Sequence, residues 1–301
     1  MSESRIGAYA AFAAICIIWG TTFAAIRVAI ETIPTLLIAG VRFLIAGSLL
    51  LVVALLSKAR FPQSRREWRD QLFAGVLMAG AGNTLVVYAE HALSSGLAAL
   101  LASTIPIWMA AMEAIAGIAS LTARRIAGLL LGFGGVGLLV APAIGRVDVS
   151  MRFFLAVGAM QLSAICWNGG TLISRRHRGS ADPMATAVVQ MFAGGVAAML
   201  AAFASGEQPS LRMFSLRSTL AVLYLAILGS VVAYTAYNYA QTKLSAGKVA
   251  SYAYVNPGIA VITGALLLRE PVTLRMIASM AIILAGVALI QLDRTRAATR
   301  A

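Results

Sequence analysis

Polar and aromatic side chains interrupt the apolar stretches of this 301-residue chain, and these are the residues whose chemistry could bind a molecule. Tyr234 and Asn238 are four residues apart, as are Tyr252 and Asn256, so each pair shares a face if its stretch is helical. Amides and phenols in apolar surroundings bind neutral or zwitterionic groups, while aromatic rings contact apolar bodies. Further candidates of the same kinds are Asn83, Tyr88, Trp108, Gln161, Trp167 and Asn168. Together they predict a pocket for a small amphipathic substrate; interhelical hydrogen bonding is the alternative role of the amides.

Two charged residues within apolar stretches have two possible roles each. Arg42 has the geometry to hold a carboxylate or phosphate with two hydrogen bonds, or it is a buried structural residue. Glu113 is either a proton-coupling carboxylate or the ion-pair partner of Arg124 or Arg125. Because no acidic residue is expected near the middle of a membrane, the sequence favours facilitated transport over proton coupling.

The composition places these residues in a membrane. The chain is 60% hydrophobic and 12% charged, whereas a soluble domain is about 25% charged. Continuous apolar runs favour helices over barrel strands, and the two cysteines, both inside such runs, are expected to be core residues. The expected spans are residues 7–29, 33–56, 70–91, 94–117, 124–141, 152–174, 183–205, 217–241, 246–268 and 273–292. The fold class is therefore predicted to be an all-α membrane protein with ten transmembrane helices.

The positive charges indicate the orientation. With both termini in the cytoplasm, sixteen Lys and Arg residues lie on the inner side and seven on the outer side, as the positive-inside rule requires. The net charge of +13 thus reports topology, and no nucleic-acid partner is expected. Glu90 and His91 would then lie in solvent at the outer end of the third span.

An internal repeat divides the chain. The segments 88–106 and 239–257, offset by 151 residues, share eight of nineteen residues, including Pro106 and Pro257. Each half (1–145 and 146–301) contains five spans, and because five is odd the second half enters the membrane inverted. Inverted repeats that meet at a central site are typical of secondary transporters, and two repeats in one chain suggest a monomer. Both prolines are expected near the midplane as helix breaks that assist gating, or as packing kinks only.

A glycine-rich motif and the absence of catalytic motifs limit other functions. "GFGGVG" (132–137) resembles a dinucleotide-binding fingerprint, but no strand precedes it. Gly128 and Gly132 form a small-xxx-small step, and close helix packing is expected to explain all of these glycines. No metal-ligand cluster, nucleophile elbow or paired carboxylates occur in the sequence, so neither a cofactor, a metal nor an enzyme activity is expected.

Four motifs together carry a resemblance to a known family. They are "WGTTFAAIR" (19–27), "VRFLIAG" (41–47), the repeated Leu-Ser-x-Gly-x-x-Ala…Pro block and "REPVT" (269–273). With them, nearly the whole chain resembles the drug/metabolite transporter superfamily, EamA type, and within it the aromatic amino-acid exporter (YddG-type) branch. The resemblance implies two inverted five-helix repeats and export of small metabolites from the bacterial cytoplasm. One departure is that only the second half has the family's acidic residue before its fifth helix, Glu270; the first half has "ASLT" (119–122).

The sequence therefore predicts an inner-membrane exporter of small amphipathic metabolites, most simply aromatic or large apolar amino acids, working by alternating access around a midplane cavity. A broad drug or cation extruder of the same fold is the alternative, for which Glu113 is the only candidate acid. A membrane-embedded enzyme or a non-transporting scaffold is disfavoured by the missing catalytic residues and by the paired repeat.

Overall fold

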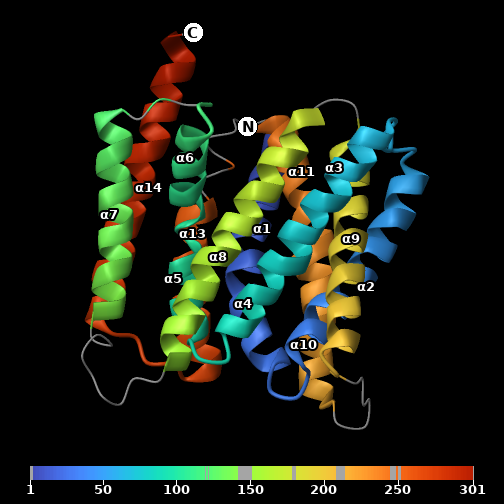
Figure 1. Ribbon diagram of the computed structural model, residues 1–301, viewed down its shortest axis with the longest axis horizontal. Coiled ribbons are helices and arrows are strands. Elements are labelled where there is room, and N and C mark those ends of the chain that lie inside the picture. Colours follow the sequence, from blue (N-terminus) through green and yellow to red (C-terminus); the bar gives the residue numbers. More distant parts are fainter. Residues whose placement is uncertain are drawn as a thin grey trace.

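The described part of the chain is helical. A computed structural model describes residues 3–118, 120, 122–141, 151–177, 181–207, 214–244, 249 and 252–300, which form helices joined by short turns (Figure 1). Among them, nine helical stretches are long and apolar enough to cross a membrane, and a tenth, Tyr254–Leu268, is shorter. Large apolar side chains such as Leu56, Leu130 and Leu266 are exposed on the outside, as lipid contact requires. The predicted all-α membrane fold is confirmed.

The first half contributes five spans. They are α1 (Glu3–Ala29); α2 (Thr35–Leu56); α3 (Arg65–Gly75), which continues through the π-helical segment η1 (Val76–Gly82) into α4 (Asn83–Ala89); α5 (Ser95–Ala102) with α6 (Ile105–Ile115); and α7 (Ala123–Val140). Hydroxyl side chains start three of these helices: Ser64, Ser94 and Thr122 each accept a hydrogen bond from the backbone N–H three residues on.

The second half repeats this order. Its helices are α8 (Met151–Ser174), ending in the short turn η3 (Arg175–His177); α9 (Pro183–Ala204); α10 (Leu216–Ala226), which continues through the π-helical segment η5 (Ile227–Val232) into α11 (Ala233–Lys243); α13 (Tyr252–Leu268); and α14 (Leu274–Arg300). The predicted boundary between the halves, at residue 145, and the start of the ninth span, at residue 246, lie outside the described residues.

The two halves are inverted relative to each other. Both chain ends lie at the same side of the molecule, here called the terminal face (Figure 1). The first helix of the first half, α1, starts at this face, whereas α8 starts at the other side, here called the opposite face (Figure 1). The segments η1 and η5 begin 151 residues apart, at Val76 and Ile227, which is the offset of the sequence repeat. Wide π-helical turns often mark functional sites.

The two repeated prolines behave differently. The fourth span breaks between α5 and α6, immediately before Pro106, and the hydroxyls of Ser103 and Thr104 donate to carbonyls three residues earlier, at 2.6 and 2.7 Å. In contrast, α13 is continuous through Pro257, so the prediction of a matching break there is wrong. A proline removes one helix hydrogen bond without necessarily ending the helix. Next to Pro257, α1 packs tightly along α13, since a Cβ added to Gly20 would lie 2.6 Å from Ile259.

Two glycines of the false dinucleotide motif, Gly132 and Gly135, and the preceding Gly128 make close helix contacts. A Cβ on Gly128 would lie 2.7 Å from the Gly286 carbonyl oxygen, and one on Gly135 would lie 2.7 Å from Ile283. Helices α7 and α14 therefore approach at their backbones. The packing interpretation fits Gly132 and Gly135 but is wrong for Gly134 and Gly137, where an added Cβ would meet nothing within 4 Å.

Candidate substrate cavity

A cavity of about 520 Å³ lies between the halves, with lining residues from both. This volume is in the range of small-molecule sites. Arg175, Ala181 and Pro183 line it where α8 ends and α9 begins, at the terminal face (Figure 1). Towards the opposite face it gives way to packed apolar side chains. Along α1, for example, Trp19 lines the cavity, whereas Phe23 and Ile26 belong to these apolar clusters.

Aromatic rings form one wall of the cavity. Trp19 contacts Tyr252 edge-on, with ring centroids 4.8 Å apart, and Tyr237 at 5.5 Å. The Trp19 indole N–H donates to the Gly229 carbonyl at 3.1 Å, in η5, which fixes the ring. Trp167, at the equivalent position of the second half, also lines the cavity. Such a wall provides flat apolar contact area for a substrate.

Neutral amides and hydroxyls form a polar patch on α3, α8 and α9. The Gln190 side-chain nitrogen donates to the Gln71 amide oxygen at 2.8 Å and to the Ser174 hydroxyl at 3.0 Å. The Ser174 hydroxyl in turn donates to Gln71 at 2.9 Å. All three residues line the cavity, so this patch offers hydrogen-bonding groups without a formal charge.

Asn168 connects the broken fourth span to the cavity. It is fully buried, and its amide nitrogen donates to the Ile105 carbonyl at 2.8 Å, next to Pro106. Its amide oxygen has no hydrogen-bond partner in the described part of the protein. A buried acceptor without a partner is costly. The Asn168 amide oxygen could therefore accept a hydrogen bond from a substrate at the cavity wall.

The charged residues at the cavity form an ion pair between the halves. The Arg175 guanidinium lies 3.5 Å from the Glu113 carboxylate, which is 9% exposed as a residue. From the sequence, Arg124 or Arg125 was predicted as the ion-pair partner of Glu113, and Arg175 was not considered. No acidic residue is among the described residues that line the cavity.

The predicted substrate-binding residues separate into two groups. Trp167, Asn168, Tyr234 and Tyr252 line the cavity, and so does Pro106, which was predicted as a helix break. The side chain of Asn238 lies outside the described residues. The remaining five residues, which do not line the cavity, are Asn83, Tyr88, Trp108, Gln161 and Asn256.

In the second group, the side chains of Asn83, Trp108, Gln161 and Asn256 make hydrogen bonds. Tyr88 is 45% exposed. The Trp108 indole N–H donates to Gln161 at 2.8 Å. The Asn256 amide nitrogen, oriented to suit its neighbours, donates to the Tyr252 and Cys16 carbonyls. For the amides among these residues, the alternative of interhelical hydrogen bonding describes the structure better.

Arg42 adopts a structural position. It is 6% exposed, and its guanidinium donates to Asn83 and to Ser230, both at 3.2 Å. Asn83 directly follows η1 and Ser230 lies within η5, so Arg42 links the two π-helical regions. It is not among the residues that line the cavity, and the structural alternative of the sequence analysis fits it.

Some lining residues escaped the sequence analysis, among them Trp19, Tyr237, Gln71 and Gln190. The repeat contains the signal for two of them: at an offset of 148 residues, Trp19 matches Trp167 and Arg42 matches Gln190. A comparison of equivalent positions would have selected Trp19 once Trp167 was chosen. No comparable signal marks Gln71.

Comparison with known proteins decides the family. The model of the EamA-like transporter family matches residues 6–141 and again residues 154–292. The chain belongs to this family. It is 34% identical over 257 residues to the "Uncharacterized inner membrane transporter YedA" of Escherichia coli (strain K12), covering 85% of this chain and 81% of that protein. It is 27% identical over 280 residues to the "Uncharacterized transporter YvbV" of Bacillus subtilis (strain 168), covering 91% and 88%.

A solved crystal structure shares the fold of this EamA-like transporter. Titled "Crystal structure of protein", it has a TM-score of 0.66 over 96% of this chain and 98% of its own, at 17% identity. The family and its relatives make the protein a multi-pass inner-membrane transporter and not an enzyme. The aromatic amino-acid exporter branch stays a prediction.

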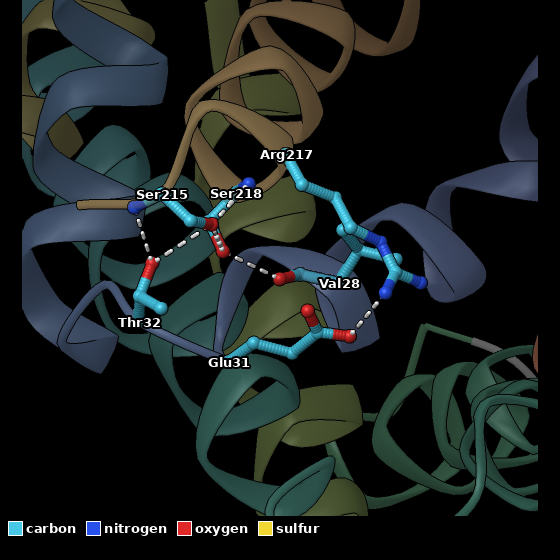
Figure 2. Close-up of polar contacts among 6 residues, drawn as sticks. All are labelled: Val28, Glu31, Thr32, Ser215, Arg217 and Ser218. Carbon is cyan, nitrogen blue, oxygen red and sulfur yellow. Dashed lines mark hydrogen bonds and ion pairs between the residues drawn. The ribbon is translucent and has the colours of Figure 1, made fainter.

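Polar contacts join the halves of the transporter at the opposite face. The Arg217 guanidinium, on α10, lies 3.5 Å from the Glu31 carboxylate, which follows α1 (Figure 2). Nearby, the Ser218 hydroxyl donates to the Val28 carbonyl at 2.9 Å, and the Ser215 N–H donates to the Thr32 hydroxyl at 3.0 Å (Figure 2). These contacts hold the end of α1 against the start of α10.

Glu270 makes a second contact between the halves at this face. Its carboxylate accepts hydrogen bonds from the Ser95 N–H and hydroxyl, both at 2.8 Å, and from the Gly96 N–H at 3.3 Å. The acid of the second half's "REPVT" motif therefore caps α5 of the first half, where the helix dipole favours negative charge. With the apolar clusters next to it, this contact joins the halves at the opposite face.

Proposed function

We propose that this transporter exports small amphipathic metabolites, with aromatic or large apolar amino acids as the first candidates, by alternating access around the cavity. The observation that carries the proposal is the lining of the 520 Å³ cavity by aromatic rings and neutral amides from both halves. A zwitterion fits hydrogen-bonding groups without net charge, and the rings suit an apolar side chain.

The proposed direction is supported by charge and shape together. Lys58, Arg60, Arg65 and Arg69 lie around the end of α2 and the start of α3 at the terminal face, and the positive-inside rule supports a cytoplasmic position for this face. The cavity reaches that face while polar and apolar contacts close the other. The structure then corresponds to an inward-open form that loads substrate from the cytoplasm. Export of organic cations is less favoured, because Glu113 is already paired with Arg175.

Transport by cavity variants tests the proposal. Proteoliposomes are loaded with one radiolabelled amino acid per batch, and efflux is compared for wild type, Trp19→Ala, Trp167→Ala and Trp108→Ala. An aromatic contact contributes about 0.5–1.5 kcal/mol, so the first two variants should raise the apparent KM about two- to tenfold.

Trp108→Ala is the matched control, because Trp108 does not line the cavity. Equal losses in all three variants, or none in Trp19→Ala and Trp167→Ala, would contradict the cavity as the substrate path. Efflux of organic cations instead of amino acids would replace the substrate class and keep the cavity.

A further inference from the structure

Glu90 is a fully buried acid at the end of α4. It directly follows the span that ends at Ala89, where the sequence predicts a solvated residue, yet its exposed fraction is 0%. Neither carboxyl oxygen has a hydrogen-bond partner in the described part of the protein. The expectation of a solvated Glu90 is therefore wrong, because contacts from the second half and from α1 cover this end of α4.

The groups around Glu90 do not neutralise an ionised carboxylate. From α1, the Arg27 guanidinium donates to the backbone carbonyl of Glu90, not to its side chain. From the α13–α14 connection, Glu270 adds a second negative charge, and its own oxygens are occupied by α5. His91 follows Glu90 in the chain and bonds Thr35 at 2.9 Å. Further along the face, a hollow of about 580 Å³ is lined by His91 and by the charged side chains of Arg27, Glu31, Arg217, Arg269 and Glu270.

The physical chemistry of this position favours the neutral acid. Burial raises the pKa of Glu90 well above its ordinary value, the neighbouring Glu270 carboxylate raises it further, and Arg27 only partly opposes them. A carboxyl group that is buried without hydrogen-bond donors keeps its proton, because ionisation would leave an uncompensated charge.

We propose that Glu90 is a proton-binding site whose carboxyl group holds a proton while the opposite face is closed and releases it when that face opens. On opening, Arg27 and Glu270 would separate and water would reach Glu90. The carboxyl O–H bond then breaks, the proton passes to water, and a carboxylate remains. The consequence for transport rests on the proposed alternating access, whereas protonation in the closed form is measurable without transport.

The sign of the pH effect follows from the two forms. In the open form a hydrated Glu90 has an ordinary pKa of about 4.3, and in the closed form its pKa is higher. The closed form is therefore favoured at low pH and loses that advantage as the pH rises through the closed-form pKa. Between the two pKa values, the ratio of closed to open protein falls up to about tenfold per pH unit.

The test is the pH dependence of thermal stability in detergent, with transport as a second readout. The melting temperatures of wild type and Glu90→Gln are compared between pH 5 and 9. Because the amide mimics the neutral acid, the stability of Glu90→Gln relative to wild type should rise with pH. In proteoliposomes, acid on the opposite face should slow wild-type efflux, and Glu90→Gln should remove this dependence.

Two variants serve as controls. His91→Gln removes the neighbouring histidine, whose pKa is lowered by burial and by Arg27, and Glu31→Gln removes a half-exposed acid of the same face. Both variants should keep the wild-type pH dependence. If Glu90→Gln does not fold, Glu90→Met, uncharged and of similar length, replaces it. The proposal is overturned if the melting curves of wild type and the Glu90 variant shift in parallel with pH, or if His91→Gln alone abolishes the dependence. If wild type transports no amino acid but the pH-dependent stability difference between wild type and Glu90→Gln is observed, the proposed function is overturned and the proton-binding site is retained.

Discussion

Replacing Glu270 with alanine is expected to open the opposite face. The substitution removes three hydrogen bonds, to the N–H and hydroxyl of Ser95 and to the N–H of Gly96. Ser95 is fully buried in the closed form, so its N–H would be left without a partner. Loss of a helix cap costs about 1 kcal/mol, and loss of a negative charge at a helix N-terminus costs up to about 1 kcal/mol more. A total of about 2 kcal/mol lowers the ratio of closed to open protein about 30-fold.

Thiol labelling measures this shift. Leu93 lies in the connection between α4 and α5 and is 2% exposed. A cysteine at this position should therefore react slowly while the face is closed. With Cys16 and Cys166 replaced by alanine, Leu93→Cys is labelled with a membrane-impermeant maleimide added at the opposite face. Glu270→Ala should raise the labelling rate by about 30-fold.

The control removes a similar cap elsewhere. Glu67 accepts a hydrogen bond from the Gln63 N–H at 2.7 Å at the start of α3, within one half and at the terminal face. Glu67→Ala should leave the labelling rate of Leu93→Cys unchanged. An unchanged rate with Glu270→Ala, or an equal rise with Glu67→Ala, would refute the assignment of Glu270 as a closing contact.

Two further substitutions test packing and surface charge. Gly128→Ala should lower the melting temperature in detergent, because its Cβ would lie 2.7 Å from the Gly286 carbonyl oxygen and overpacking costs about 1–3 kcal/mol. Gly134→Ala should leave the melting temperature unchanged, because its Cβ would meet nothing within 4 Å. Equal effects of the two substitutions would contradict close packing of α7 on α14. Glu31→Gln should change maleimide labelling at the opposite face less than about fivefold, since its pair with Arg217 is solvent-exposed and such pairs contribute at most about 1 kcal/mol; a change above tenfold would show that this pair closes the face.

The sequence was sufficient for the helical spans, for the inversion of the halves and for part of the cavity. Apolar run lengths and the repeat predict the spans and their inversion, because both depend on the membrane and on local sequence. Helical spacing shows that two residues share a face but not where that face points. Asn83 was selected on polarity alone, and in the structure Arg42, from another span, engages its amide. Tyr88 was selected on the same basis and lies on an exposed face.

Burial at the span ends depends on contacts between the halves, which no local pattern encodes. Glu90 has the sequence position of a solvated residue, but α1 and the connection before α14 cover it. The π-helical segments are similar in this respect. Their matching offset follows from the repeat, yet only the structure shows that Arg42 joins them through Asn83 and Ser230.

The two faces of this transporter cannot close by equivalent contacts. The repeat that places Glu270 before the last helix places Ala119 at the equivalent position of the first half, and alanine has no carboxylate to cap a helix. At the terminal face the charged contacts between the halves are instead Glu113 with Arg175, at the cavity mouth, and Arg60 with Asp182, at 3.3 Å. An exchange of conformations between the repeats would therefore give an outward-open form stabilised by different groups. Substitutions at Glu270 should then shift access in one direction, a bias that symmetric repeats would not show.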